Sequence, residues 1–212
     1  MDAETPKDGE LSLPQAFLLL ATDDKGGEPE LPAFVLRVAV AGAVLAELEL
    51  LGAIELQGKR VRATGAAPES EFQHQLELIR EKSRPHTPKR WVAMLESRAE
   101  LHRLYEGMAS LGVVEHVGEK RLGLFKTTRY PEKDHAPEAA LLQKVQAVLG
   151  GAPSDSRTTA LTALLYAAGL LDRLFPGAEQ IRARALAKDH WPSRAVVDEL
   201  RMVRMAEAEA AT

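Results

Sequence analysis

The sequence lacks cysteine altogether in its 212 residues. That absence excludes disulfide bonds, cysteine-ligated metal sites and a thiol nucleophile. Long apolar runs are also missing: the longest uncharged stretch, residues 158–171, has 14 residues, whereas a helix that spans a bilayer needs about 20 apolar residues. We therefore expect a buried core helix in this stretch and no transmembrane segment, so that any membrane contact is peripheral.

Neither sign of charge has a large excess, because the formal net charge is −4. DNA-binding domains usually carry a clear basic excess, so this balance argues against a nucleic-acid partner. With 45% hydrophobic and 27% charged residues, the composition is that of a soluble globular protein. The opening residues, MDAETPKDGE, are acidic and lack the apolar stretch of a signal peptide. We expect residues 1–10 to form a mobile acidic segment, with no secretory signal and a cytoplasmic location.

Catalytic motifs are missing as well. The sequence has no glycine-rich phosphate loop, no HExxH or GxSxG motif and no histidine pair at metal-ligand spacing. The six histidines are scattered, and each is most simply a surface residue. We therefore expect no catalysis, no cofactor and no metal.

The patterns that are present are mostly helical. Ser12 and Gln15 have capping-box spacing before a short apolar helix. Residues 31–51 are apolar nearly all round, which predicts a central helix that Gly52 ends. Alternating apolar and polar residues predict hairpins around Gly58 and over residues 113–126. Further helices are expected at 69–82, 137–149, 154–174, 179–188 and 193–207. The two helix–glycine–hairpin units form a weak internal repeat. We expect a mainly α fold: a single helical domain with a central apolar bundle, surrounding amphipathic helices and short β-hairpins.

The charge is unevenly distributed along the chain. Residues 80–104 hold seven basic and three acidic residues, a local net charge of +4, whereas residues 1–30 carry −6. Clustered arginines suit anionic phosphate groups, which guanidinium binds bidentately, and a tryptophan favours a membrane interface. The alternative is that the basic segment pairs with the acidic N-terminal one. Trp91, with Met94 and Leu95, fits an inward helical stripe, so we expect it in the core.

Four blocks, in order, resemble the Golgi phosphoprotein 3-like (GPP34) family: LSLPQAFLLLATDDKGG, AELELLGAIELQGKRV, SLGVVEHVGEKRLGLFKTTRYPEKD and TALTALLYAAGLLDRLF. The resemblance covers about residues 11–175 and extends to the C-terminal helices, which places a GPP34-like helical domain over residues 11–208. High alanine and arginine content suggests a bacterial member. The resemblance implies a peripheral membrane protein that binds a phosphatidylinositol 4-phosphate-like headgroup.

The resemblance also implies where such a headgroup would bind. The family pocket uses a tryptophan and an arginine around the long helix, and two arginines three residues apart in the helix before the second hairpin. These positions fall on Pro32, Ala41, Arg98 and Leu101, so only Arg98 matches. Nearby arginines could supply replacement charge. The candidate headgroup-binding residues are therefore Arg98, Arg90, Arg84, Arg103 and Arg37.

The second hairpin is a candidate contact surface. In the relatives it mediates oligomer contacts, and here it carries the apolar residues Leu122, Leu124 and Phe125 among basic ones. We expect it either to contact a second subunit or anionic lipid, or to pack within the molecule.

Two other functions compete with lipid binding. A helix, a glycine and a hairpin with a basic turn also describe a winged-helix DNA-binding unit, although the helix over residues 31–51 has a single arginine. A protein–protein scaffold that never touches lipid is the third possibility.

Overall fold

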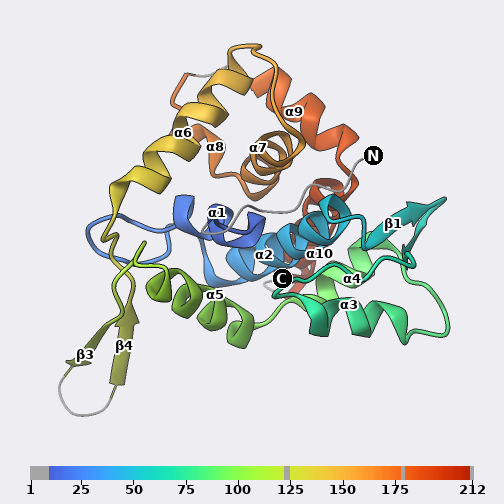
Figure 1. Cartoon of the computed structure of the whole chain (residues 1–212), viewed down its shortest axis with the longest axis horizontal. Helices are drawn as coiled ribbons and strands as arrows, with labels where there is room; N and C mark the ends of the chain where they lie inside the picture. The colour runs from blue at the N-terminus through green and yellow to red at the C-terminus, as the bar shows by residue number, and fades with distance from the viewer. Residues whose placement is uncertain (1–9, 122–124, 178–179, 211–212) are drawn as a thin grey trace.

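The fold is built around one buried helix, α2 (Ala33–Leu50), in a computed structural model that describes residues 10–121, 125–177 and 180–210. Of its 18 residues, 14 are buried. A helix that is apolar nearly all round has to be covered on every side. Helices α1 (Leu13–Leu20), α7 (Ser156–Ala168) and α10 (Trp191–Ala210) pack against it (Figure 1).

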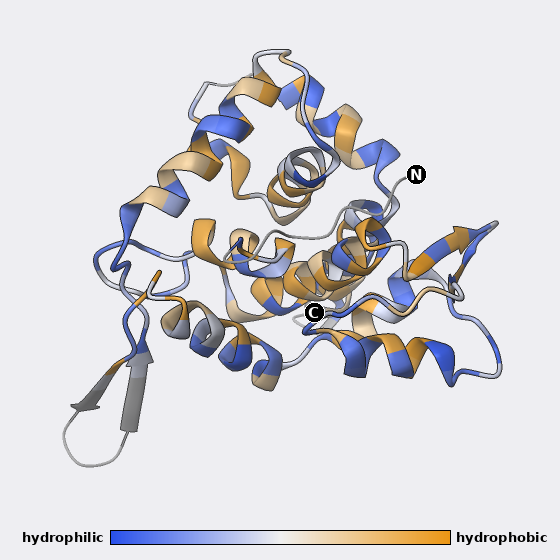
Figure 2. Cartoon of the chain, in the orientation of Figure 1, coloured by the Kyte–Doolittle hydropathy of each residue, from blue (hydrophilic) through white to orange (hydrophobic). Residues whose placement is uncertain are grey.

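The remaining elements surround these four helices. Apolar residues gather toward the middle of the molecule and hydrophilic ones lie on the outer helices (Figure 2). The outer elements are β1 (Ile54–Gln57), β2 (Arg60–Ala63), α3 (Gln73–Arg80), α4 (Pro88–Leu95), α5 (Arg98–Ser110), β3 (Val117–Arg121), β4 (Phe125–Arg129), α6 (His135–Leu149), α8 (Leu171–Leu174) and α9 (Gln180–Asp189).

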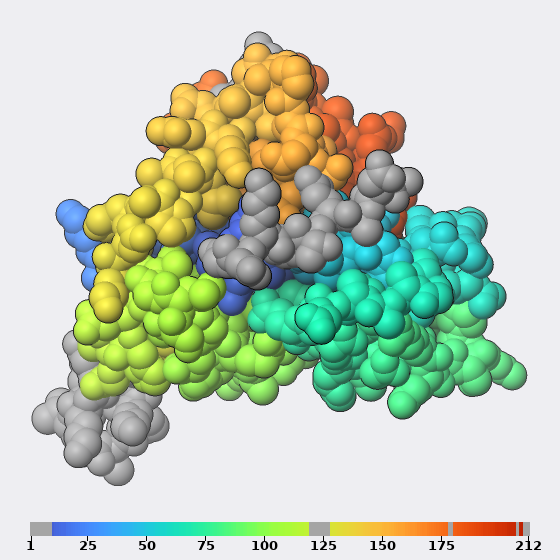
Figure 3. Space-filling view, in the orientation of Figure 1, coloured from blue at the N-terminus to red at the C-terminus, as the bar shows by residue number. Residues whose placement is uncertain are grey.

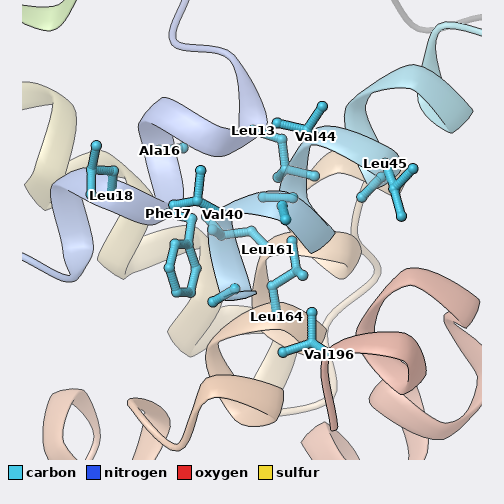
Figure 4. Packing of buried hydrophobic residues seen from close by; sticks show 14 of the residues in the cluster. Leu13, Ala16, Phe17, Leu18, Val40, Val44, Leu45, Leu161, Leu164 and Val196 are labelled. Carbon is cyan, nitrogen blue, oxygen red and sulfur yellow. The ribbon is translucent and has the colours of Figure 1, made fainter. Parts of the chain in front are cut away.

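Side chains from α1, α2, α7 and α10 meet in the core (Figure 4). Phe17 of α1 and Leu164 of α7 are fully buried there. Gly42 lets α10 approach α2 closely, because a Cβ atom at this position would lie 2.1 Å from Cγ2 of Val196. The close contact between α2 and α10 therefore depends on this glycine.

A buried ion pair joins three of the core helices. Glu47 of α2 accepts two hydrogen bonds from the Arg157 guanidinium of α7, at 2.7 and 2.9 Å, and one from the Leu13 backbone N–H of α1, at 2.7 Å. The Glu47 side chain is 2% exposed. Such a pair keeps its net stabilisation only with good geometry and additional hydrogen bonds, and both conditions are met here.

The two helix–glycine–hairpin units share their local geometry. Gly52 and Gly112 both have positive φ angles, 67° and 75°. In each unit the residue after the glycine donates its N–H to a carbonyl five residues earlier, Ala53 to Leu48 and Val113 to Met108. This is the Schellman ending of a helix. The weak repeat in the sequence therefore corresponds to two similar helix ends, each followed by an antiparallel strand pair.

The predicted fold class is confirmed: the described part is mainly α-helical, with two small strand pairs. Trp91 is fully buried, as expected. The sequence predicts one helix over residues 154–174, but the structure has two helices there. Gly169 has a φ of 77° and ends α7, and α8 begins at Leu171.

Candidate functional site

The basic segment over residues 80–104 lies on the outside of the molecule. It runs from the end of α3 through α4 to α5, and the chain from α3 to α5, teal to green in Figure 3, forms a continuous surface along the lower part of that view. Arg84, Arg90 and Arg98 are exposed. Their guanidinium groups have no hydrogen bond or ion pair with another residue that the structure describes. These three predicted site residues are therefore available to an anionic partner.

Arg103, a fourth candidate, is held by the protein itself. Its guanidinium pairs with Glu100 at 2.6 Å and with Glu71 at 2.8 Å, and it lies over the Phe72 ring at 5.2 Å. The hydrogen bond to Glu100 raises the pKa of Arg103 above its ordinary value. Arg103 thus fastens α5 to the chain before α3 and is not a free charge.

The positions implied by the family pocket are only partly suited to a charged ligand. Pro32 is exposed and precedes α2, and Arg98 is exposed at the start of α5. Ala41, in contrast, is 2% exposed in the core, and Leu101 is half-buried against it. Arg37, the fifth candidate, is half-buried on α2. The structure therefore does not bring the five candidate arginines together around one cavity that it describes.

The alternative pairing of the basic segment with the acidic N-terminal segment is not seen for residues 10–30. Glu28 pairs with Arg129 at 2.9 Å, and Glu30 pairs with Arg173 at 2.8 Å. Both arginines lie outside residues 80–104. The acidic segment over residues 1–10 lies outside the described residues except for Glu10.

A groove between α10 and the end of α7 combines apolar surface with positive charge. Its volume is about 400 Å³. It is open to solvent along α10, and its apolar lining comes from both helices. The lining residues are Ala167, Val197, Leu200, Arg201, Arg204, Met205 and Ala208.

The C-terminal half of α10, which lines this groove, exposes two methionines and two arginines. Met202 and Met205 are 49% and 53% exposed, although most large apolar side chains in the described residues are buried. Arg201 and Arg204 alternate with them on α10, and neither forms an ion pair with a described residue. Arginine buries its aliphatic stem along apolar surface and keeps its guanidinium at the polar boundary. The groove therefore suits a molecule with an apolar part and an anionic part.

The sequence signal for this groove was the run RMVRM, residues 201–205. Residues three apart are neighbours on a helix surface, so this run places Arg201 beside Arg204 and Met202 beside Met205. The groove itself could not be predicted, because it needs the end of α7 to lie beside α10.

The base of the second hairpin is fastened to α5 by a polar and aromatic cluster. The Tyr130 hydroxyl donates to Glu106 Oε1 at 2.8 Å, and His116 Nδ1 lies 2.7 Å from the same oxygen. Tyr130 also stacks on Tyr105, with ring centroids 4.3 Å apart. The predicted contact residues Leu122 and Leu124 lie outside the described residues, and of Phe125 only the backbone, in β4, is described.

Two of the expectations from the sequence concern particular helices. The helix that would have to read DNA in the first winged-helix-like unit, α2, is buried along most of its length and cannot enter a groove. In the described part of the chain, no helix is both long and apolar enough to cross a membrane.

Comparison with protein families gives one match. The model of the family described as Golgi phosphoprotein 3 (GPP34) matches residues 13–203. No curated protein is similar enough to be matched. The matched residues run from the start of α1 to within α10.

Proposed function

This chain belongs to the Golgi phosphoprotein 3 (GPP34) family, and from that premise we propose that it is a non-catalytic peripheral protein that binds anionic phospholipid at a membrane surface. The observation that carries the proposal is the groove between α7 and α10. Its apolar lining fits acyl chain or glycerol backbone, and Arg201 and Arg204 at its edge fit the phosphate.

The exposed methionines support the same function. Contiguous exposed apolar patches often mark sites of interaction with a protein or a membrane, and Met202 and Met205 are neighbours on one helix. Met202 and Met205 would enter the boundary between headgroups and acyl chains, while Arg201 and Arg204 remain at the headgroups. The C-terminal half of α10 is thereby the part that contacts the membrane.

The three free arginines of the basic segment add long-range attraction. Arg84, Arg90 and Arg98 contribute positive charge without an internal partner that the structure describes. Arg98 is also the position that matches the pocket expected from the family resemblance. Because this contribution is electrostatic, it should weaken with salt, since the Debye length is about 8 Å at physiological ionic strength.

Vesicle flotation tests the proposal. The whole chain is mixed with vesicles of phosphatidylcholine alone, or with vesicles that also contain phosphatidylglycerol or phosphatidylinositol 4-phosphate. We expect binding to both anionic compositions and little to phosphatidylcholine. A basic side chain near an anionic surface contributes about 1 kcal/mol, so the double variant R201Q/R204Q should bind about 30-fold more weakly.

A matched control separates the groove from net charge. The double variant R182Q/R184Q removes the same charge from exposed positions of α9 and should bind nearly as well as the unaltered protein. The single variant R98Q tests the position expected from the family, and a selective loss for phosphatidylinositol 4-phosphate would show headgroup recognition there. Equal, negligible binding to all vesicles would contradict the proposed function, and a gel shift of duplex DNA at low salt would favour the DNA-binding alternative.

A further inference from the structure

Three segments meet beside the start of α6, and the first of them is distant from the other two in the sequence. They are the loop between α1 and α2, the chain that leaves β4, and the first turn of α6 (Figure 1). The backbone N–H of Glu132 donates to the Asp24 carbonyl at 2.9 Å, and the N–H of Tyr130 donates to the Gly27 carbonyl at 2.9 Å. These bonds hold side chains more than 100 residues apart in the sequence against one another.

Oxygen and nitrogen ligands converge at this junction. One ligand atom from each of Asp24, Glu132 and His135 lies within 4.8 Å of the other two. Oε2 of Glu132 is hydrogen-bonded to Nδ1 of His135. His135 is at the first position of α6, and its side chain is 76% exposed, whereas that of Glu132 is 2% exposed. One buried carboxylate is thus surrounded by more exposed groups that can adjust.

The buried carboxylate has an unsatisfied oxygen. Oε1 of Glu132 is buried and has no hydrogen-bond partner in the part of the chain that the structure describes. Leaving such an atom unpaired is unfavourable, because it has lost its hydration without gaining a bond. Within the described residues, no lysine or arginine pairs with Asp24 or Glu132. The junction therefore has more negative charge and more acceptor atoms than these residues satisfy.

A third carboxyl group, that of Glu138, lies beside those of Asp24 and Glu132. Glu138 lies one turn further along α6 and is buried. Burial, together with the nearby carboxylates of Asp24 and Glu132, raises the pKa of Glu138 to about 8. The ligand atoms that converge remain those of Asp24, Glu132 and His135.

We propose that this junction binds a divalent transition-metal cation, with ligands from Asp24, Glu132 and His135. The cation takes the place of the proton that the imidazole and the Glu132 carboxylate share, and it satisfies the second oxygen of that carboxylate. The imidazole in the ligand set favours Zn²⁺ over Ca²⁺ and Mg²⁺, which prefer oxygen alone, and the two carboxylates also suit Mn²⁺. Bond lengths of about 2.0–2.2 Å place ligand atoms about 3.3 Å from one another, and the exposed side chains of Asp24 and His135 are free to adjust to that spacing.

Metal binding at this site would fix the loop that leads into α2. The cation would connect the α1–α2 loop to the chain after β4 and to α6, in addition to the backbone hydrogen bonds that already join them. The site is independent of the lipid-binding groove and of the function proposed above. Its sequence pattern is Glu132-x-x-His135, with Asp24 supplied by a distant loop.

Equilibrium dialysis tests this proposal directly. The untagged whole chain, first treated with a chelator, is dialysed against Zn²⁺ or Mn²⁺, and the bound metal is counted. We expect one saturable equivalent of metal. The variants H135A and D24N each remove a ligand from an exposed side chain, so they should fold normally and bind at least tenfold more weakly.

A control variant and a second readout complete the test. H74A removes an exposed histidine from α3 and should leave metal binding unchanged. In thermal unfolding, metal should raise the Tm of the unaltered protein and of H74A, because a ligand that binds only the folded state stabilises it, and it should leave the Tm of H135A unchanged. The proposal is overturned if the unaltered protein binds no stoichiometric metal, or if H135A and D24N bind as tightly as H74A.

Discussion

At the scale of single residues, the ion pair between Glu47 and Arg157 has the largest expected effect on stability. The two side chains are 2% and 13% exposed and connect α2 to α7. Removing one partner of a buried pair leaves an uncompensated charge, which costs more than the pair contributes. The fold therefore depends on both residues being present or both being replaced.

We expect R157M to lower the free energy of unfolding by roughly 3 kcal/mol, because it leaves Glu47 charged and buried. The double variant E47Q/R157M should recover part of that loss, since glutamine carries no charge and its side-chain oxygen can still accept the Leu13 N–H bond. Urea unfolding followed by circular dichroism measures both. A double variant less stable than R157M would contradict this view of the pair.

Single residues also show what the sequence could and could not reveal about the site. The exposure of Arg84, Arg90 and Arg98 could be predicted, because their neighbours in the sequence are polar. The ion pair of Arg103 with Glu71 could not be predicted. It joins residues 32 positions apart and depends on how α5 packs beside the chain before α3. His190, expected on the surface, is half-buried, and burial together with Arg194 lowers its pKa to about 4.

At the scale of elements, helix positions were predictable because the apolar patterns and the capping residues agree. Helix α1 begins where Ser12 and Gln15 predict, with the Ser12 N–H donating to Gln15 Oε1 at 3.0 Å. The break between α7 and α8 was missed, because apolar residues continue on both sides of Gly169. A glycine inside a helical pattern can be tolerated or can end the helix, and only the tertiary packing decides between these outcomes.

The ending of α7 gives a prediction at this scale. Gly169 has a φ of 77°, and a Cβ atom added there would meet no described atom within 4 Å, so its substitution is limited by backbone conformation and not by space. We expect G169A to lower the free energy of unfolding by about 1 kcal/mol, because alanine disfavours the left-handed region. Thermal or urea unfolding measures the change.

Gly65 provides the matched control for this substitution. It also has open space around a Cβ atom, and its φ angle is not in the left-handed region. G65A should therefore change stability by less than about 0.5 kcal/mol. Equal effects of G169A and G65A would show that the left-handed conformation does not determine where α7 ends.

At the scale of the whole molecule, the fold separates a buried core from two exposed regions that could meet a partner. The core of α1, α2, α7 and α10 is continuous (Figure 4). The groove on α10 has one exposed methionine, Met205, and two arginines without a described partner, and the surface from α3 to α5 has three further arginines of this kind. The net charge of −4 therefore conceals local positive charge where an anionic surface could bind.

Entry of the C-terminal half of α10 into the surface of an anionic membrane can be measured by site-specific fluorescence. The natural absence of cysteine allows single labelling sites, so an environment-sensitive fluorophore can be attached to M205C on the groove or to I181C on α9, where Ile181 is 79% exposed. On vesicles that contain phosphatidylglycerol, we expect a blue-shifted and brighter emission from position 205 and no change from position 181. An unchanged emission at 205, or the same change at both positions, would contradict the proposed membrane contact of α10.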